Sequence, residues 1–70
     1  MEQQIEIELN GAPHQLRQGQ NLEELIGALE LSNQALAVAV NRQIVPRHGW
    51  SERILQPRDR VDVVRAIGGG

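Results

Sequence analysis

The sequence IEIEL at residues 5–9, followed at once by Asn10-Gly11, places the tightest constraint on how this chain can fold. Apolar and acidic side chains alternate strictly, which is typical of a strand that is buried on one face only. Asn-Gly tolerates positive φ at both positions and favours a two-residue hairpin turn. The sequence therefore predicts an antiparallel second strand from about His14 to Arg17, with Pro13 in the turn or at the first strand position.

A single helix is expected next, over about residues 22–30. Asn21 followed three residues later by Glu24 is a capping box with Asn at the N-cap. The apolar residues that follow repeat at the helical spacing i, i+3, i+4, i+7 and are Leu22, Leu25, Ile26 and Leu29. This spacing gives the helix one apolar stripe, which must pack against the sheet.

Three further segments complete the expected elements. The run LAVAV at residues 36–40 is typical of a buried strand. Val38 and Val40 are expected to face the helix, and Ala37 and Ala39 the other side of the sheet. Asn41-Arg42 predicts a tight turn into a short strand at 43–45. Residues 50–55 are expected to form a loop or one helical turn, anchored through Trp50, Ile54 and Leu55. Residues 56–59 predict a turn, in which Arg58-Asp59-Arg60 is expected to be solvated, and residues 61–67 predict the final strand.

This order of elements predicts an α+β fold, with one helix packed on one face of a small mixed sheet of four to five strands. The first and last strands should be neighbours in its middle. The other face has no helix to cover it and is expected to be open to a partner. We expect a single domain at residues 1–67, and a flexible tail at 68–70.

Composition excludes several classes of function. The chain has 70 residues, no cysteine, and seven basic residues that are all scattered arginines. A thiolate site and a disulfide are therefore absent, a cytoplasmic location is favoured, and neither a signal peptide nor a membrane span is expected. The scattered arginines do not form a basic stripe, so nucleic-acid binding is not expected. The sequence shows no arrangement of catalytic residues, so an enzyme is not expected. His14 and His48 are expected to be ordinary histidines rather than metal ligands.

The glycines Gly68, Gly69 and Gly70 at the end of the sequence allow two interpretations. They could be a frayed or adventitious terminus. Alternatively, three extended residues reach about 10 Å and could pass a carboxylate into a narrow channel of another protein. An ionised carboxylate is a poor electrophile, so it would first have to be activated, for example as an acyl-adenylate.

The sequence VNRQIVPR at residues 40–47, followed by Trp50, by Asp59 ahead of a β-rich strand, and by Ile67 and the terminal Gly69-Gly70, closely resembles the ThiS family of sulfur carriers of thiamine biosynthesis. The resemblance implies a ubiquitin-like β-grasp fold. The sequence differs from the family pattern at Gly68 and in the turn at 57–59, where the family commonly has Gly-Asp.

The resemblance also implies a mechanism. An adenylating partner of the ThiF type uses ATP to activate the carboxyl of Gly70, and sulfur from a cysteine-desulfurase persulfide converts it to a thiocarboxylate. The thiocarboxylate donates sulfur to a thiazole synthase of the ThiG type. Gly68 and Gly69 form the thin segment that threads into the partners. The carrier binds no cofactor and is acted on by these enzymes.

A docking surface for the partners is expected at Val64, Arg65 and Ile67, where the last strand leads into the tail. Two alternatives stay open from the sequence. The chain could be a carrier of the same fold for another pathway, such as molybdopterin synthesis, tRNA thiolation or cysteine synthesis. It could also be a β-grasp docking module with an inert tail.

Overall fold

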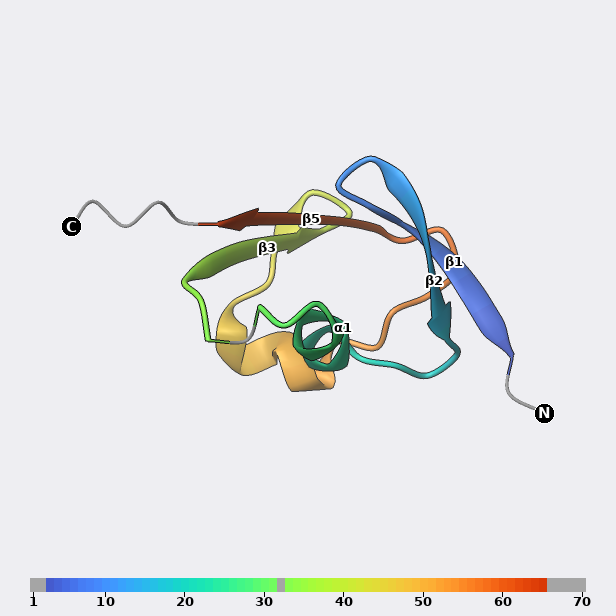
Figure 1. Cartoon of the computed structure of the whole chain (residues 1–70), viewed down its shortest axis with the longest axis horizontal. Coiled ribbons are helices and arrows are strands. Elements are labelled where there is room, and N and C mark those ends of the chain that lie inside the picture. The colour runs from blue at the N-terminus through green and yellow to red at the C-terminus, as the bar shows by residue number, and fades with distance from the viewer. Residues whose placement is uncertain (1–2, 32, 66–70) are drawn as a thin grey trace.

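The computed structural model describes residues 3–31 and 33–65. It contains one five-stranded sheet with the strand order β2-β1-β5-β3-β4. The elements, in chain order, are β1 (Gln4–Leu9), β2 (Ala12–Arg17), α1 (Leu22–Ala28), β3 (Leu36–Val40), β4 (Gln43–Ile44), the 3-10 helix η1 (Arg47–Glu52) and β5 (Arg60–Arg65). β1 and β5 are parallel neighbours, and the other pairs are antiparallel. The expected mixed sheet is confirmed (Figure 1).

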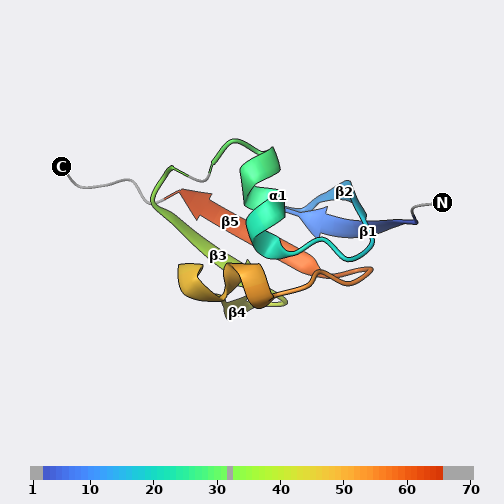
Figure 2. The ribbon, with the colours of Figure 1, turned by 90° about the horizontal axis from the view of Figure 1, so that it is seen from below.

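Helix α1 packs on one face of this sheet, and the segment with η1 lies beside it on the same side (Figures 1 and 2). The opposite face is not covered by any described element. The two-layer arrangement predicted from the sequence is therefore confirmed, including its open face.

The first hairpin forms because Asn10 and Gly11 both take positive φ, 49° and 84°. Its second strand begins at Ala12, two residues earlier than expected, so Pro13 lies inside the strand opposite Glu8. β2 is an edge strand, and the register directs the backbone nitrogen of Pro13 away from β1. The missing N–H therefore removes no bond from the sheet.

The N-terminus of α1 has the complete capping box. The Asn21 side chain accepts a hydrogen bond from the Glu24 N–H at 2.8 Å, and the Glu24 carboxylate accepts one from the Asn21 N–H at 3.0 Å. The helix ends at Ala28, before the expected residue 30, and Glu30 follows with a φ of 60°. Leu22, Leu25 and Ile26 are fully buried, as the apolar stripe predicts.

The core is aliphatic apart from one ring, that of Trp50. Its buried members are Ile5, Ile7, Leu16, Leu22, Leu25, Ile26, Val38, Val40, Trp50, Leu55 and Val61. The indole N–H of Trp50 donates to the Val45 carbonyl at 2.9 Å, and the Arg47 guanidinium lies 4.6 Å from the ring centroid.

The long connection before β5 differs from the prediction in two respects. Its helical turn is η1, which begins at Arg47 rather than at Trp50. Trp50 and Leu55 are buried as expected, but Ile54 is 43% exposed. The expectation that Ile54 anchors the segment is wrong, because the extended backbone after η1 directs consecutive side chains to opposite sides and Leu55 takes the inner one.

The turn before β5 was expected to be solvated, and for Asp59 this is wrong. Asp59 is 8% exposed. Its carboxylate accepts hydrogen bonds from the Asn41 side-chain amide at 3.0 Å and from the Gln56 N–H at 2.8 Å. These bonds satisfy a buried charge, and they join the β3–β4 turn to the start of β5.

Candidate functional site

β5 connects the body of the protein to the glycines that the sequence singles out. Its side chains alternate between the two faces of the sheet. Val61 and Val63 face α1 and the core, whereas Asp62 and Val64 project from the uncovered face. Arg65 is the last described residue of the strand and, by the same alternation, lies on the face of α1.

An apolar patch occupies the uncovered face around Val64. Cross-strand pairing places Ala37 opposite Val64, and Ala39 opposite Ile44. Ile44 is 70% exposed and Val64 is 61% exposed. We call Ala37, Ala39, Ile44 and Val64 the uncovered-face patch. Such a patch typically marks a site of protein–protein contact.

Ile44 was not singled out from the sequence. The run Gln43-Ile44 showed a strand, but not which side of it faces solvent. The pairing of Ala39 with Ile44 fixes that side. The small alanines predicted for the outer face of β3 were the signal that this face is apolar.

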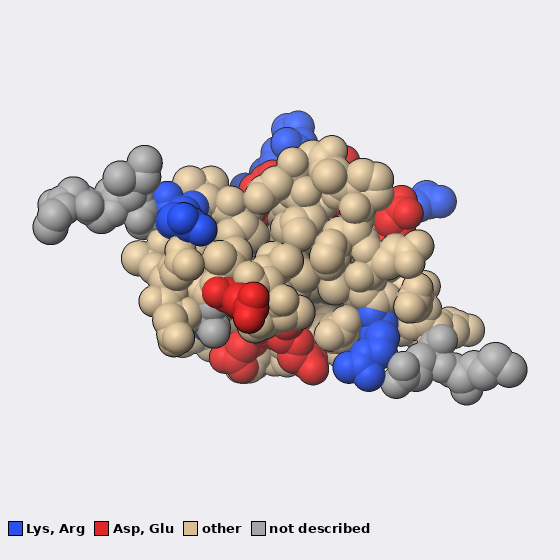
Figure 3. Space-filling view, viewed as in Figure 1, with Lys and Arg blue, Asp and Glu red and all other residues tan. Residues whose placement is uncertain are grey.

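Ion pairs border the patch at the other end of β5. The Arg60 guanidinium lies 3.6 Å from the Glu8 carboxylate and 3.4 Å from that of Asp62. All three side chains are partly exposed to solvent, so these pairs add little stability. Figure 3 shows that acidic and basic side chains are dispersed over the face in view, without one large basic field.

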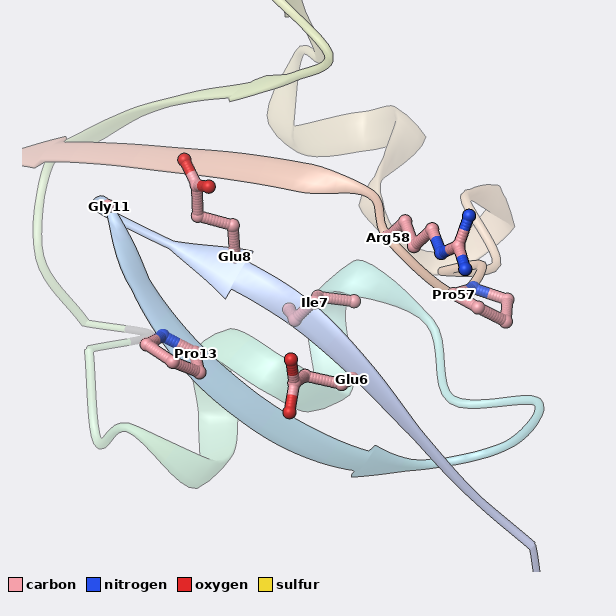
Figure 4. Close-up of a pocket in the computed structure, with 7 residues that line it drawn as sticks. All are labelled: Glu6, Ile7, Glu8, Gly11, Pro13, Pro57 and Arg58. Carbon is pink, nitrogen blue, oxygen red and sulfur yellow. The ribbon is translucent and has the colours of Figure 1, made fainter.

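A shallow hollow lies beside the first hairpin, on the side of the turn at Pro57-Arg58 (Figure 4). Glu6 and Glu8 project from β1 into this region, and Pro13 closes its far side. Both carboxylates are exposed to solvent, and the lining contains no histidine, serine or threonine beside them. This arrangement does not form a reaction centre.

The structure brings two of the predicted docking residues together at the end of β5. Val64 belongs to the uncovered-face patch, and Arg65 is exposed on the other side of the strand. Ile67 and the glycines Gly68, Gly69 and Gly70, on which the tail chemistry was placed, lie outside the described residues. The expected domain end at residue 67 lies outside them too.

Within residues 3–31 and 33–65, no group of three histidine or acidic side chains could hold a metal ion. The same part of the chain contains no helix that is long and apolar enough to cross a bilayer.

The fold and the open sheet face place the chain in the ubiquitin-like β-grasp class. A crystal structure of a thiamine biosynthesis protein from Geobacter metallireducens superposes on it with a TM-score of 0.81, covering 94% of this chain and 100% of that one. At 23% sequence identity this likeness establishes the fold alone.

The family follows from the sequence comparisons. The model of the ThiS family matches residues 3–70, so the chain belongs to the ThiS family. It is 35% identical, over 66 residues, to the sulfur carrier protein ThiS of Escherichia coli (strain K12), covering 94% of this chain and 100% of that protein. It is 38% identical to part of a thiazole synthase of Magnetococcus marinus, of whose length it spans 20%.

Proposed function

We propose that this chain is the sulfur carrier of thiamine biosynthesis, and that the carboxyl of Gly70 bears the sulfur as a thiocarboxylate. The family match over residues 3–70 carries this proposal, because it includes the terminal glycine. The likeness to the Escherichia coli carrier over that protein's whole length supports it. The chain is then a protein cosubstrate in the cytoplasm rather than an enzyme.

The chemistry divides between the chain and its partners. A ThiF-type enzyme joins the Gly70 carboxylate to the AMP of ATP and releases pyrophosphate. The terminal sulfur of a persulfide, formed with sulfur from a cysteine desulfurase, attacks the acyl-adenylate, displaces AMP and forms an acyl disulfide. A thiol reductant cleaves this disulfide and leaves the thiocarboxylate, which donates its sulfur to a ThiG-type thiazole synthase. The chain has no cysteine, so it has no thiol on which it could carry the sulfur instead.

The ThiG-type partner has separate support. The Magnetococcus protein that contains a segment similar to this chain is named thiazole synthase. A carrier and the enzyme that it serves would be expected to act together, and one polypeptide with both parts fits this relation.

The partners dock on the uncovered-face patch and on the end of β5. Val64 supplies apolar area, Arg65 supplies charge, and Ile67 continues the contact toward the tail. Arg65→Glu and Val64→Asp should each weaken the binding of the ThiF-type enzyme. Unchanged binding of both variants would contradict this assignment.

The proposed function is tested by the intact mass of the protein after incubation with ATP, a ThiF-type enzyme, a persulfide sulfur donor and a thiol reductant. We expect one oxygen atom to be replaced by sulfur, and fragmentation should locate the change at Gly70. Deletion of Gly70, or addition of one residue after it, should abolish adenylation. Glu52→Gln, at an exposed position of η1 outside the tail and the docking residues, is the control and should be adenylated normally.

A docking module with an inert tail gives a different result. It would bind its partner with full affinity after the deletion of Gly70, and the wild-type mass would not change. This result would reject the carrier function.

A further inference from the structure

The half of β5 nearest the C-terminus has an open hydrogen-bonding edge. β1 pairs with β5 only as far as Val61 and then turns away at Asn10. On the other side, β3 remains paired with β5 as far as Arg65. Figure 2 shows β5 continuing past the β1–β2 hairpin. β5 is therefore a central strand in its first half and an edge strand in its second.

The hydrogen bonds of Asn10 show which backbone groups face this edge. The Asn10 N–H donates to the Val61 carbonyl at 2.9 Å, and its side-chain oxygen accepts from the Val63 N–H at 2.8 Å. Backbone groups alternate along a strand, so Arg65 faces the same side. Within the described part of the chain, the Val63 carbonyl and the Arg65 N–H have no hydrogen-bond partner there.

An apolar groove lies alongside the open edge, on the face of α1. It has a volume of about 510 Å³ and is lined by Asn10, Leu29, Leu31, Leu36, Val63 and Arg65. Its leucines come from the segment after α1 and from β3, and they are only half-buried. Arg65 is exposed and forms no ion pair with the described residues. The groove thus combines an apolar floor with one available positive charge.

We infer that an extended segment of the ThiF-type partner adds to the sheet as a strand at the Val63–Arg65 edge. This inference rests on the proposed function for the identity of the partner. The segment pairs with the Val63 carbonyl and the Arg65 N–H, directs an apolar side chain into the groove toward Leu31, and places a carboxylate near Arg65. Strand addition of this kind gains affinity from main-chain hydrogen bonds and specificity from the pocket that accepts alternate side chains.

Two features favour a partner protein over a second copy of this chain. The free edge is short, and a second copy would bring a second Arg65 to it, so repulsion between like charges opposes self-pairing. The edge also leads directly into residues 66–70, which the ThiF-type enzyme must hold if it acts on Gly70. A partner strand here would contact the chain at the base of the segment that it processes.

The backbone contribution is isolated by comparing Arg65→Pro with Arg65→Ala. Both variants remove the guanidinium, but only proline removes the N–H. That N–H points away from β3, so its loss breaks no bond within the sheet. We expect Arg65→Pro to have a KM for adenylation about tenfold higher than Arg65→Ala, as expected for the loss of one intermolecular hydrogen bond. Leu31→Asp should also raise the KM, whereas Ile54→Asp, at an exposed position outside the groove, should not.

Amide hydrogen exchange gives a second measurement that does not depend on a variant. The Arg65 amide should exchange rapidly in the free protein and become protected when the ThiF-type enzyme is added. Equal KM values for the two Arg65 variants, with an unprotected Arg65 amide, would overturn the inference and leave the proposed function intact. Protection in the free protein at high concentration, together with dimer formation, would assign the edge to a second copy and would also overturn it. A wild-type chain that is not adenylated would reject both proposals.

Discussion

The replacement Asp59→Ala should be the most destabilising single change in the turn before β5. The carboxylate is 8% exposed and accepts two hydrogen bonds, from the Asn41 side chain at 3.0 Å and from the Gln56 N–H at 2.8 Å. A hydrogen bond to a charged group contributes about 1.5–3 kcal/mol. Two such bonds together contribute about 3–6 kcal/mol. Asn41 is itself exposed and can rebind water, so we expect a loss in the lower part of this range, about 3–4 kcal/mol.

A loss of this size is a large fraction of the total stability, because a domain of this length is typically stable by only about 4–10 kcal/mol. Urea unfolding followed by the fluorescence of Trp50 measures it directly. Trp50 is the only aromatic residue of the chain and is buried, so its emission should report global unfolding. With a slope of about 1 kcal/mol per molar urea, the midpoint should fall by about 3 M or more.

Asp62→Ala, in the strand that follows the turn, is the matched control. Asp62 is partly exposed, and its carboxylate lies 3.4 Å from the exposed guanidinium of Arg60. Pairs of this kind contribute about 0–1 kcal/mol. Asp59→Asn should be intermediate, since its amide can accept only one of the two bonds. If Asp59→Ala were no more destabilising than Asp62→Ala, the buried carboxylate would not hold the start of β5 as we argue.

Three further predictions concern the backbone, the helix cap and the patch. Arg58 has a φ of 70°, so Arg58→Gly should raise the free energy of unfolding by about 1 kcal/mol, whereas Arg60→Gly in the extended strand should lower it; urea unfolding compares the two. Asn21→Ala removes the capping box and should cost about 1 kcal/mol by the same assay, with Asn21→Ser retaining most of the stability. Ile44→Asp should change the free energy of unfolding by no more than about 0.5 kcal/mol but weaken binding of the ThiF-type enzyme about tenfold or more. Titration calorimetry measures this affinity, which should be unchanged in the control variant Ile54→Asp.

Most of the fold could be predicted because its signals are local. The alternation at residues 5–9 and the Asn-Gly turn fix the first hairpin, and Asn21 with Glu24 fixes the start of α1. The neighbouring positions of β1 and β5 in the middle of the sheet followed from the order of the elements. The ends of the elements were less predictable, because Pro13 is accommodated in a strand whose neighbour lies only on one side.

The buried Asp59 could not be predicted, because its partners come from elsewhere in the fold. In the sequence it stands between two arginines, which is typical of a solvated turn. Its burial depends on Asn41, 18 residues away. The exposure of Ile44 likewise depends on pairing with Ala39. Of the residues assigned to docking, Val64 and Arg65 fall within the described chain, and the tail assignment at Gly70 stays a prediction.

The organisation of β5 explains how so short a chain can combine a stable core with a surface for partners. A strand has two faces and two edges, and each has a separate role here. Val61 and Val63 stabilise the core, Val64 extends the uncovered-face patch, and the backbone at Arg65 is free on the edge that β1 has left. Inserting or deleting one residue in β5 would shift its register and exchange its two faces. The same change would therefore expose a core valine and remove Val64 from the uncovered-face patch. Stability and docking are therefore coupled in β5 by the geometry of a single strand.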